Sequence, residues 1–156
     1  MNLFRSPSGP AEPAANIARI AVGLIWLAGA AFNALVTMRM AEPFDWLESS
    51  PVAPYRWFFR DVAGARPELW TALLVAAEAT MGILTLARGR WARLGLGLGA
   101  LFSAFLFTLA TPYTLIMGAW ATLLAWLARK DYPTSPLDPL IRVLTNRRWG
   151  SPRSPA

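Results

Sequence analysis

Four long apolar stretches, separated by shorter polar or aromatic segments, dominate the pattern of hydrophobic and polar positions along this chain. They cover residues 17–38, 69–87, 91–111 and 113–128. A helix satisfies its own backbone hydrogen bonds in lipid, and roughly 18 or more apolar residues are needed to span the hydrocarbon core. The first three stretches reach that length and the fourth falls slightly short. The pattern therefore predicts a small integral membrane protein.

Two short breaks divide the second half of the chain. Residues 94–128 form a nearly unbroken apolar run, which as one helix would be about 50 Å long, well beyond the membrane core. Pro112 disfavours helix at the residue before it and suits a first helical turn, so we expect two helices here. Arg88-Gly89-Arg90 makes the preceding turn equally short. Short connections favour antiparallel neighbours. The short fourth stretch leaves a re-entrant segment open as an alternative.

These breaks predict an all-α fold, a bundle of four transmembrane helices running up-down-up-down over residues 17–128. Residues 1–16 precede it as a cytoplasmic segment, and residues 129–156 follow as a basic cytoplasmic tail. The first stretch, at about 22 residues, exceeds the 7–15 of a signal-peptide core, which favours an uncleaved first helix.

The first connection, 39–68, is the long one. It mixes aromatic and charged residues, and Pro51 and Pro54 split it. We expect two short interfacial helices in this outer loop, with their aromatic side chains at headgroup depth. They serve either as an anchor or as a lid over the bundle. In the third stretch, Gly95 and Gly99 have the spacing that lets a neighbouring helix approach closely, and packing within the bundle is favoured over dimerisation.

Charge and composition set the orientation and exclude several classes of function. The chain has 55% hydrophobic and 15% charged residues, against about 25% charged in soluble domains. Of its 15 Lys and Arg residues, only Arg39, Arg56, Arg60 and Arg66 lie on the side of the first connection. This bias predicts a multi-pass protein of the inner membrane with both termini cytoplasmic, in contact with the lipid bilayer. The same distribution argues against nucleic acid as a partner.

The chain also lacks the residues of several common active sites. With no Cys and no His, it has no disulfide, no thiolate-held iron–sulfur cluster, and none of the usual haem or zinc ligands. It has no Ser/His/Asp set, no Gly-rich phosphate loop and no metal-ligand spacing. We expect no metal site and no intrinsic cofactor, and no catalytic residue can be named.

Glu78 is the one acidic residue within the apolar stretches. It lies about 13 Å from the outer end of its helix. A charged side chain at such a depth costs roughly 2.5–3.5 kcal/mol, so it usually faces the bundle interior and has a partner. Glu78 either carries a proton or binds a small polar ligand, or it is a neutral carboxyl that only fixes the packing of helices.

Other polar and aromatic residues of the outer half are candidates to join Glu78. Asn33 and Ser103 lie at about 8 and 12 Å from the outer ends of their helices. Thr80 and Tyr113 add hydroxyl groups, and Trp26 is a ring within a span rather than at an interface. We expect a ligand pocket in the outer half. The candidate ligand-binding residues are Glu78, Asn33, Ser103, Thr80, Tyr113 and Trp26. For Asn33 and the hydroxyl residues taken singly, a hydrogen bond within the helix is the alternative, and for Trp26 it is simple packing. Arg19, at the inner end, is expected to extend toward headgroups.

The order of these residues resembles the DoxX family of small four-span membrane proteins. The resemblance covers roughly residues 17–128 and rests on Arg19, Gly23, Trp26 and Gly29, then Glu78 and Gly82, then Gly89 and Arg93. One position departs from the family pattern, because its basic residue in the first span falls here on Phe32 or Asn33.

The resemblance implies a four-helix membrane protein associated with redox systems, with redox partner proteins and a quinone as a possible cofactor. The leading hypothesis is an accessory subunit of a quinone-linked redox system. A small-solute or proton-coupled transporter and a structural membrane scaffold are the alternatives.

Overall fold

The computed structural model describes residues 13–48, 50–109, 114–136 and 138. Within these ranges every regular element is a helix, as predicted. Helices α1 (Pro13–Leu35), α4 (Pro67–Leu86) and α5 (Arg90–Thr108) belong to segments long and apolar enough to cross a membrane. The prediction of long apolar helices is confirmed, with ends within a few residues of the predicted bounds.

The fourth helix, α6, runs from Thr114 to Leu127 and is shorter than the other three. Its 14 residues give a length of about 21 Å, less than the thickness of a hydrocarbon core. The predicted break at Pro112 lies outside the described residues. The turn between α4 and α5 is described, and Gly89 at its centre has φ of +59°, a conformation that L side chains rarely adopt.

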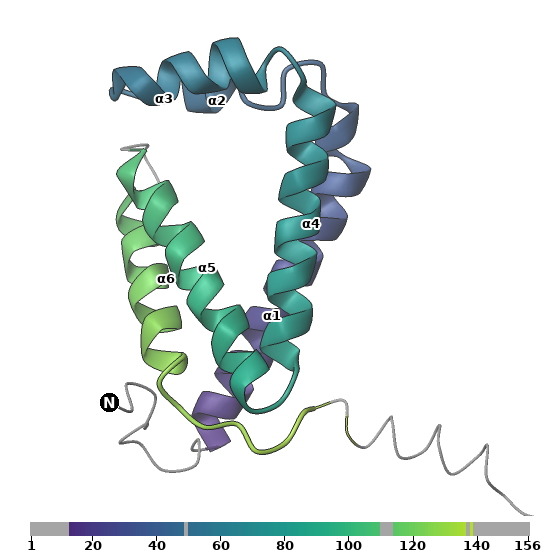
Figure 1. Cartoon of the computed structure of the whole chain (residues 1–156), viewed down its shortest axis with the longest axis vertical. Coiled ribbons are helices and arrows are strands. Elements are labelled where there is room, and N and C mark those ends of the chain that lie inside the picture. Colours follow the sequence, from purple (N-terminus) through teal and green to yellow (C-terminus); the bar gives the residue numbers. More distant parts are fainter. Residues whose placement is uncertain (1–12, 49, 110–113, 137, 139–156) are drawn as a thin grey trace, which may run out of the picture.

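The long helices form two pairs (Figure 1). Helix α1 packs against α4, α4 against α5, and α5 against α6. The ribbons of the α1–α4 pair and the α5–α6 pair converge at the α4–α5 turn and diverge toward the other end (Figure 1). We call these the tail end, where residues 128–138 lie, and the loop end, where the first connection lies.

Small residues make the helix contacts near the tail end possible. A Cβ on Gly95 would lie 2.5 Å from the Thr85 backbone nitrogen, so α5 touches the backbone of α4 there. A Cβ on Gly82 would lie 2.8 Å from Leu27 Cγ and 3.0 Å from the Gly23 carbonyl oxygen, so α4 also lies close to α1 there. At Gly99 the nearest atom is Trp26 Nε1, 3.2 Å from a built Cβ. The predicted role of Gly95 and Gly99 in packing between helices is confirmed.

The first connection contains short helices that cross the loop end (Figure 1). They are η1 (Thr37–Arg39), α2 (Asp45–Glu48), α3 (Ala53–Trp57) and η2 (Phe58–Ala63), of which η2 is a π-helix. The prediction of short helices here is confirmed; their depth in a membrane stays a prediction.

Two contacts tie this connection to the end of α5. The Ser50 hydroxyl donates to the Leu109 carbonyl oxygen at 2.7 Å, and the Tyr55 and Thr108 hydroxyls lie 2.8 Å apart. Below them, Phe44, Phe59 and Leu109 belong to a small hydrophobic cluster of their own. Several aromatic side chains of the first connection therefore pack against the rest of the protein.

Arg19 holds the tail end together from inside. Its side chain is completely buried, and its guanidinium lies 4.6 Å from the centre of the Tyr132 ring. It donates to the carbonyl oxygens of Thr85 and Ala87 at the end of α4, and to that of Thr134 beyond α6. The prediction that Arg19 extends toward headgroups is wrong, because the last carbonyls of α4 have no partner within their own helix and Arg19 supplies one.

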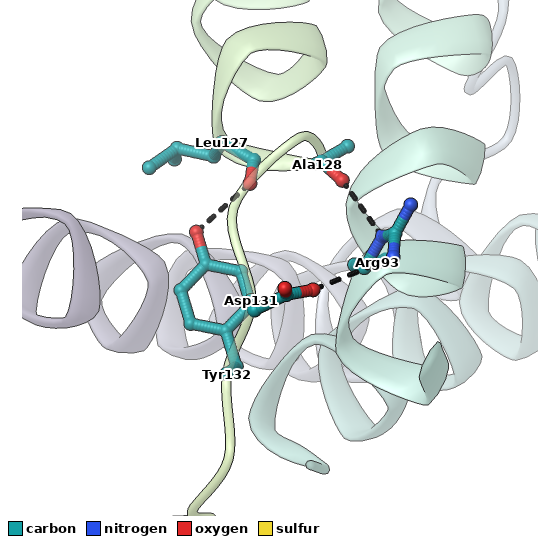
Figure 2. Close-up of polar contacts among 5 residues, drawn as sticks. All are labelled: Arg93, Leu127, Ala128, Asp131 and Tyr132. Atoms are coloured by element: carbon teal, nitrogen blue, oxygen red, sulfur yellow. Dashed lines mark hydrogen bonds and ion pairs between the residues drawn. The ribbon is translucent and has the colours of Figure 1, made fainter. Parts of the chain in front are cut away.

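The residues that follow α6 pack under the same end (Figure 2). The Tyr132 hydroxyl donates to the Leu127 carbonyl at 2.9 Å, and Arg93 on α5 bonds the Ala128 carbonyl at 3.2 Å and Asp131 at 3.4 Å. Tyr132 is buried within the main hydrophobic core, which also contains Trp26 and Leu124. The first residues of the predicted tail thus belong to the packed helical unit.

Candidate functional site

Glu78 lies at the contact between α4 and α1. Its side chain is buried, and the Asn33 Nδ2 donates to Glu78 Oε2 at 2.8 Å. Gly29, one turn before Asn33, leaves the space that the carboxyl group fills, since a Cβ there would lie 3.2 Å from Glu78 Oε1. Among the described residues Glu78 has no cationic partner. The predicted pairing of a sheltered acid with an outer-half polar group is observed for Asn33.

The hydrogen bonding continues from Asn33 toward the loop end. The Thr37 hydroxyl donates to Asn33 Oδ1 at 2.7 Å, and Thr37 is itself buried. Thr37 and Asn33 are four residues apart, which places them one turn apart on the same side of the chain. Thr37, Asn33 and Glu78 therefore form an ordered row of polar groups; we call it the polar row.

A cavity of about 310 Å³ lies at the loop end of the polar row. Its lining includes Thr37, Arg39, Met40, Pro67, Glu68 and Thr71. Thr71 is completely buried, and its hydroxyl, itself inaccessible, has no hydrogen-bond partner among the described residues. Thr71 precedes Glu78 by two helical turns, about 10 Å along α4. We call this space the threonine cavity.

A second cavity of about 440 Å³ adjoins it, sharing Ala41, Pro43 and Pro67 in its lining. It carries three acidic residues, Glu42, Asp45 and Glu48, together with Arg60. The hydrogen bond and negative charge of Asp45 raise the pKa of Glu42 above its usual range. The Arg60 guanidinium pairs with Asp61 at 2.9 Å and lowers the pKa of that carboxyl, so this cavity, which we call the acidic cavity, has a negative lining.

The structure does not bring the other predicted residues to Glu78. Thr80 is exposed and donates to the Ala76 carbonyl at 2.7 Å; it follows Glu78 by two residues, which turns it to a different face of α4. Ser103 is buried but donates to the Gly99 carbonyl at 2.9 Å within its own helix. Tyr113 lies outside the described residues.

Trp26 belongs to the main core. Its ring packs edge-on against Phe102 at a centroid distance of 5.8 Å. Its Nε1 is buried without a hydrogen-bond partner. Simple packing, the alternative considered for Trp26, describes these contacts.

Sequence reasoning missed Thr37, Thr71 and Gly29 as neighbours of the site. Helical spacing could have found two of them, because Thr37 follows Asn33 by one turn and Thr71 precedes Glu78 by two turns. Gly29 was noted only among the residues of the resemblance to the DoxX family. Apart from this spacing, nothing in the sequence marked Thr71, since a single threonine in a membrane helix usually bonds within the helix.

The geometry limits the chemistry that Glu78 can support. A lone buried carboxyl bonded to one amide can exchange a proton or accept a hydrogen bond. The two cavities described above are lined by neither Glu78 nor Asn33. Within the described residues no group of acidic side chains is arranged to hold a metal ion. Comparison of the chain with protein-family models, curated proteins and solved structures gives no match.

Proposed function

We propose that this chain is a DoxX-like accessory protein of a membrane redox system, with four spans in the inner membrane and both termini cytoplasmic. The distribution of Lys and Arg supports the orientation. The residues of the resemblance support the family, since Gly23, Gly29, Glu78 and Gly82 all lie where α1 meets α4. Electron transfer belongs to a partner protein, because this chain has neither Cys nor His to hold a redox centre.

The contribution of this chain is to exchange protons at Glu78. The observation that carries this proposal is the polar row, in which a buried carboxyl without a cationic partner is linked through Asn33 to Thr37 at a cavity. Water in the threonine cavity would reach Thr37 directly. The Asn33 amide does not itself carry a proton, so the last step to Glu78 requires a water molecule that enters when α1 and α4 move apart beside Asn33. Quinone chemistry consumes or releases protons, and a carboxyl inside the membrane can store one.

A quinone is not assigned to Glu78 itself. The carboxyl lies against Gly29 and Asn33, and a quinone ring does not fit between them. A quinone of the redox system binds to the partner protein or at the contact between that protein and this chain. Glu78 then supplies or accepts protons from inside this chain.

Infrared spectroscopy of the purified protein tests the proton step. We expect a band of the protonated carboxyl that changes with pH and is absent from Glu78→Gln. Glutamine keeps the oxygen that accepts from Asn33 but cannot release a proton, so the fold should be retained. Thr37→Val should slow the change of the band after a pH jump. Thr80→Val is the matched control, because Thr80 is exposed and bonds only within its helix. A pH-independent spectrum identical in wild type and Glu78→Gln would contradict the proposal.

A structural scaffold is the second function, because the Asn33–Glu78 bond joins α1 to α4. The same variants separate the two. If Glu78→Gln preserves both stability and the activity of the redox system in cells, Glu78 acts only in packing. If stability is preserved and cellular activity is lost, the proton is required. Native mass spectrometry of the protein purified with its partners identifies the redox protein and any bound quinone.

A further inference from the structure

The tail end brings two basic segments of the chain together. The Gly89 amide donates to the Tyr132 carbonyl oxygen at 2.7 Å. Arg93, on the first turn of α5, donates to the Ala128 carbonyl oxygen at 3.2 Å (Figure 2). These two contacts pair the start of α5 with the residues after α6 in antiparallel order. We call the paired segments the basic patch: residues 88–93 and 128–132.

Positive charge dominates the basic patch. Its sequence contains five cations and one acid: Arg88, Arg90, Arg93, Arg129 and Lys130, with Asp131. Like charges that are held this close repel one another, and an anion at the same place lowers that repulsion. The charge balance of the patch therefore favours a negatively charged partner.

Two of these cations lie over tryptophan rings. The Arg90 guanidinium is 5.0 Å from the centre of the Trp91 ring, and the Lys130 ammonium is 4.9 Å from that of Trp126. Both rings are about half exposed, Trp91 at the start of α5 and Trp126 near the end of α6. Tryptophan at the end of a membrane helix usually lies at headgroup level. The two cations are therefore held level with lipid headgroups.

Beyond Trp91, the exposed surface of α5 is apolar. Leu94, Leu98 and Leu101 are exposed and follow Trp91 by about one, two and three helical turns. A surface with cations at one end and exposed leucines next to them matches a phospholipid, which has a phosphate at one end and acyl chains below it.

We propose that the basic patch holds an anionic phospholipid. The lipid phosphate lies at Arg90 and Lys130, and an acyl chain lies against the leucines of α5. Basic sites at the ends of membrane helices are suited to anionic headgroups. A zwitterionic lipid is disfavoured, because its ammonium group is repelled by the excess of cations.

Asp131 opposes this binding. It contacts Arg93 at 3.4 Å, longer than a strong charge-assisted bond, and the Asp131 side chain is about half exposed. The carboxylate contributes little to stability and repels a phosphate at the same place. Removing a cation and removing this acid should therefore change lipid binding in opposite directions.

Lipid binding at the basic patch goes beyond the proposed function and does not depend on it. The patch lies at the tail end, whereas the polar row runs from Glu78 toward the loop end. Glu78→Gln should therefore retain lipid as wild type does. Lipid retention without a proton-dependent signal from Glu78 would be a failure of the earlier proposal alone.

Native mass spectrometry of the full-length protein in mild detergent tests the proposal. The probes are phosphatidylglycerol and phosphatidylcholine with identical acyl chains. We expect the anionic lipid to bind at least about tenfold more tightly. Arg90→Gln and Lys130→Gln should each weaken phosphatidylglycerol binding by about fivefold, because each loses one cation at headgroup level. Asp131→Asn should strengthen it by about twofold or more.

Two arginines of the loop end are the matched controls. Arg39→Gln and Arg66→Gln change the net charge by the same amount, and both residues are exposed. In detergent both ends of the protein are accessible, so a general attraction of the lipid to the basic chain would respond equally to all four glutamine variants. We expect the loop-end variants to bind phosphatidylglycerol within about twofold of wild type.

Three results would overturn the proposal. The first is equal binding of phosphatidylglycerol and phosphatidylcholine by wild type, which would leave the patch as a surface for an acidic protein. The second is an equal loss in the loop-end and tail-end variants. The third is weaker binding in Asp131→Asn, since a phosphate at the patch requires the opposite change.

Discussion

Two threonines on α4 show how differently the two ends of the molecule are built. Thr71 and Thr85 are both completely buried, and neither hydroxyl has a hydrogen-bond partner. Thr85, at the tail end, is packed against α5 so closely that a Cβ on Gly95 would lie 2.8 Å from its hydroxyl oxygen. Thr71, at the loop end, lines a cavity of about 310 Å³. Both hydroxyls are enclosed, but only at the loop end does a cavity lie beside the threonine.

The difference extends to the charged groups. At the tail end, Arg19 is surrounded by carbonyl oxygens and the Tyr132 ring, and Arg93 bonds the residues after α6 (Figure 2). At the loop end, Arg39 and Glu68 line a cavity and are exposed, and neither forms an ion pair with another described residue. Stability is therefore expected to depend on the tail end, and proton exchange on the loop end, where the helix pairs diverge.

The largest expected effect is that of replacing Arg19. Arg19→Met removes the donors to three backbone carbonyl oxygens while keeping side-chain length. Hydrogen bonds to a charged group contribute about 1.5–3 kcal/mol each, so the free energy of unfolding should fall by at least about 3 kcal/mol. Arg88→Met, an exposed arginine of the same turn, should change it by less than about 0.5 kcal/mol. Unfolding in detergent measures both, and equal effects would contradict the role given to Arg19.

Two glycines of α5 sharpen the comparison of packed and open positions. Gly95→Ala places a Cβ 2.5 Å from the Thr85 backbone nitrogen and should cost about 1–3 kcal/mol by forcing α4 and α5 apart. Gly97→Ala meets no atom within 4 Å, and it should stabilise the protein by up to about 1 kcal/mol through helix propensity. If α5 packs as described, thermal unfolding shows a lower melting temperature for Gly95→Ala and a higher one for Gly97→Ala than for wild type. Effects of the same sign would contradict that packing.

Tyr132 should make the tail end sensitive to alkaline pH. Burial raises the pKa of Tyr132 from 10 to about 12, although the positive charge of Arg19 acts to lower it. Because the folded protein holds the phenol proton more tightly than the unfolded chain, this stabilisation is complete below pH 10 and is lost as pH rises to about 12. Tyr132→Phe should lose about 1 kcal/mol near neutral pH with the bond to Leu127, and then show a smaller alkaline loss.

Unfolding free energies at pH 9, 10 and 11 measure this effect for wild type and for two variants. Tyr55→Phe at the loop end is the control and should retain the alkaline loss due to Tyr132. An alkaline loss in Tyr132→Phe equal to that of wild type would contradict the assignment.

The long helices could be predicted from the sequence because each depends on a local pattern. Unbroken apolar runs gave α1, α4 and α5, and Gly89 marked the turn between two of them. Helical depth placed Asn33 among the candidate partners of Glu78, because an acid inside a membrane needs a polar partner near its own level, but depth did not separate Asn33 from Ser103 or Thr80. Gly95 and Gly99 could be recognised from their spacing, which lets another helix approach closely.

What could not be predicted depends on contacts between distant segments. Arg19 bonds Thr134 across more than a hundred residues, and no periodicity relates the two. Tyr132 and Ser135 likewise dock onto helix ends from a segment whose composition indicates only a polar tail. Thr80 was assigned to the site by depth without regard to the side of the helix on which it lies. Thr71 became notable only when the structure placed it in the lining of a cavity with its hydroxyl buried.

Thiol labelling of two cysteine variants tests the contrast between the ends most directly, because the natural chain has no cysteine. Met40→Cys at the cavity of the loop end and Thr85→Cys at the tail end place one thiol at each position, and a small, charged, water-soluble thiol reagent is added to the folded protein in detergent or vesicles. We expect the thiol at position 40 to react at least about tenfold faster, because it is exposed at the cavity whereas position 85 is enclosed by α5. Equal rates, or faster reaction at position 85, would contradict an open loop end and a closed tail end.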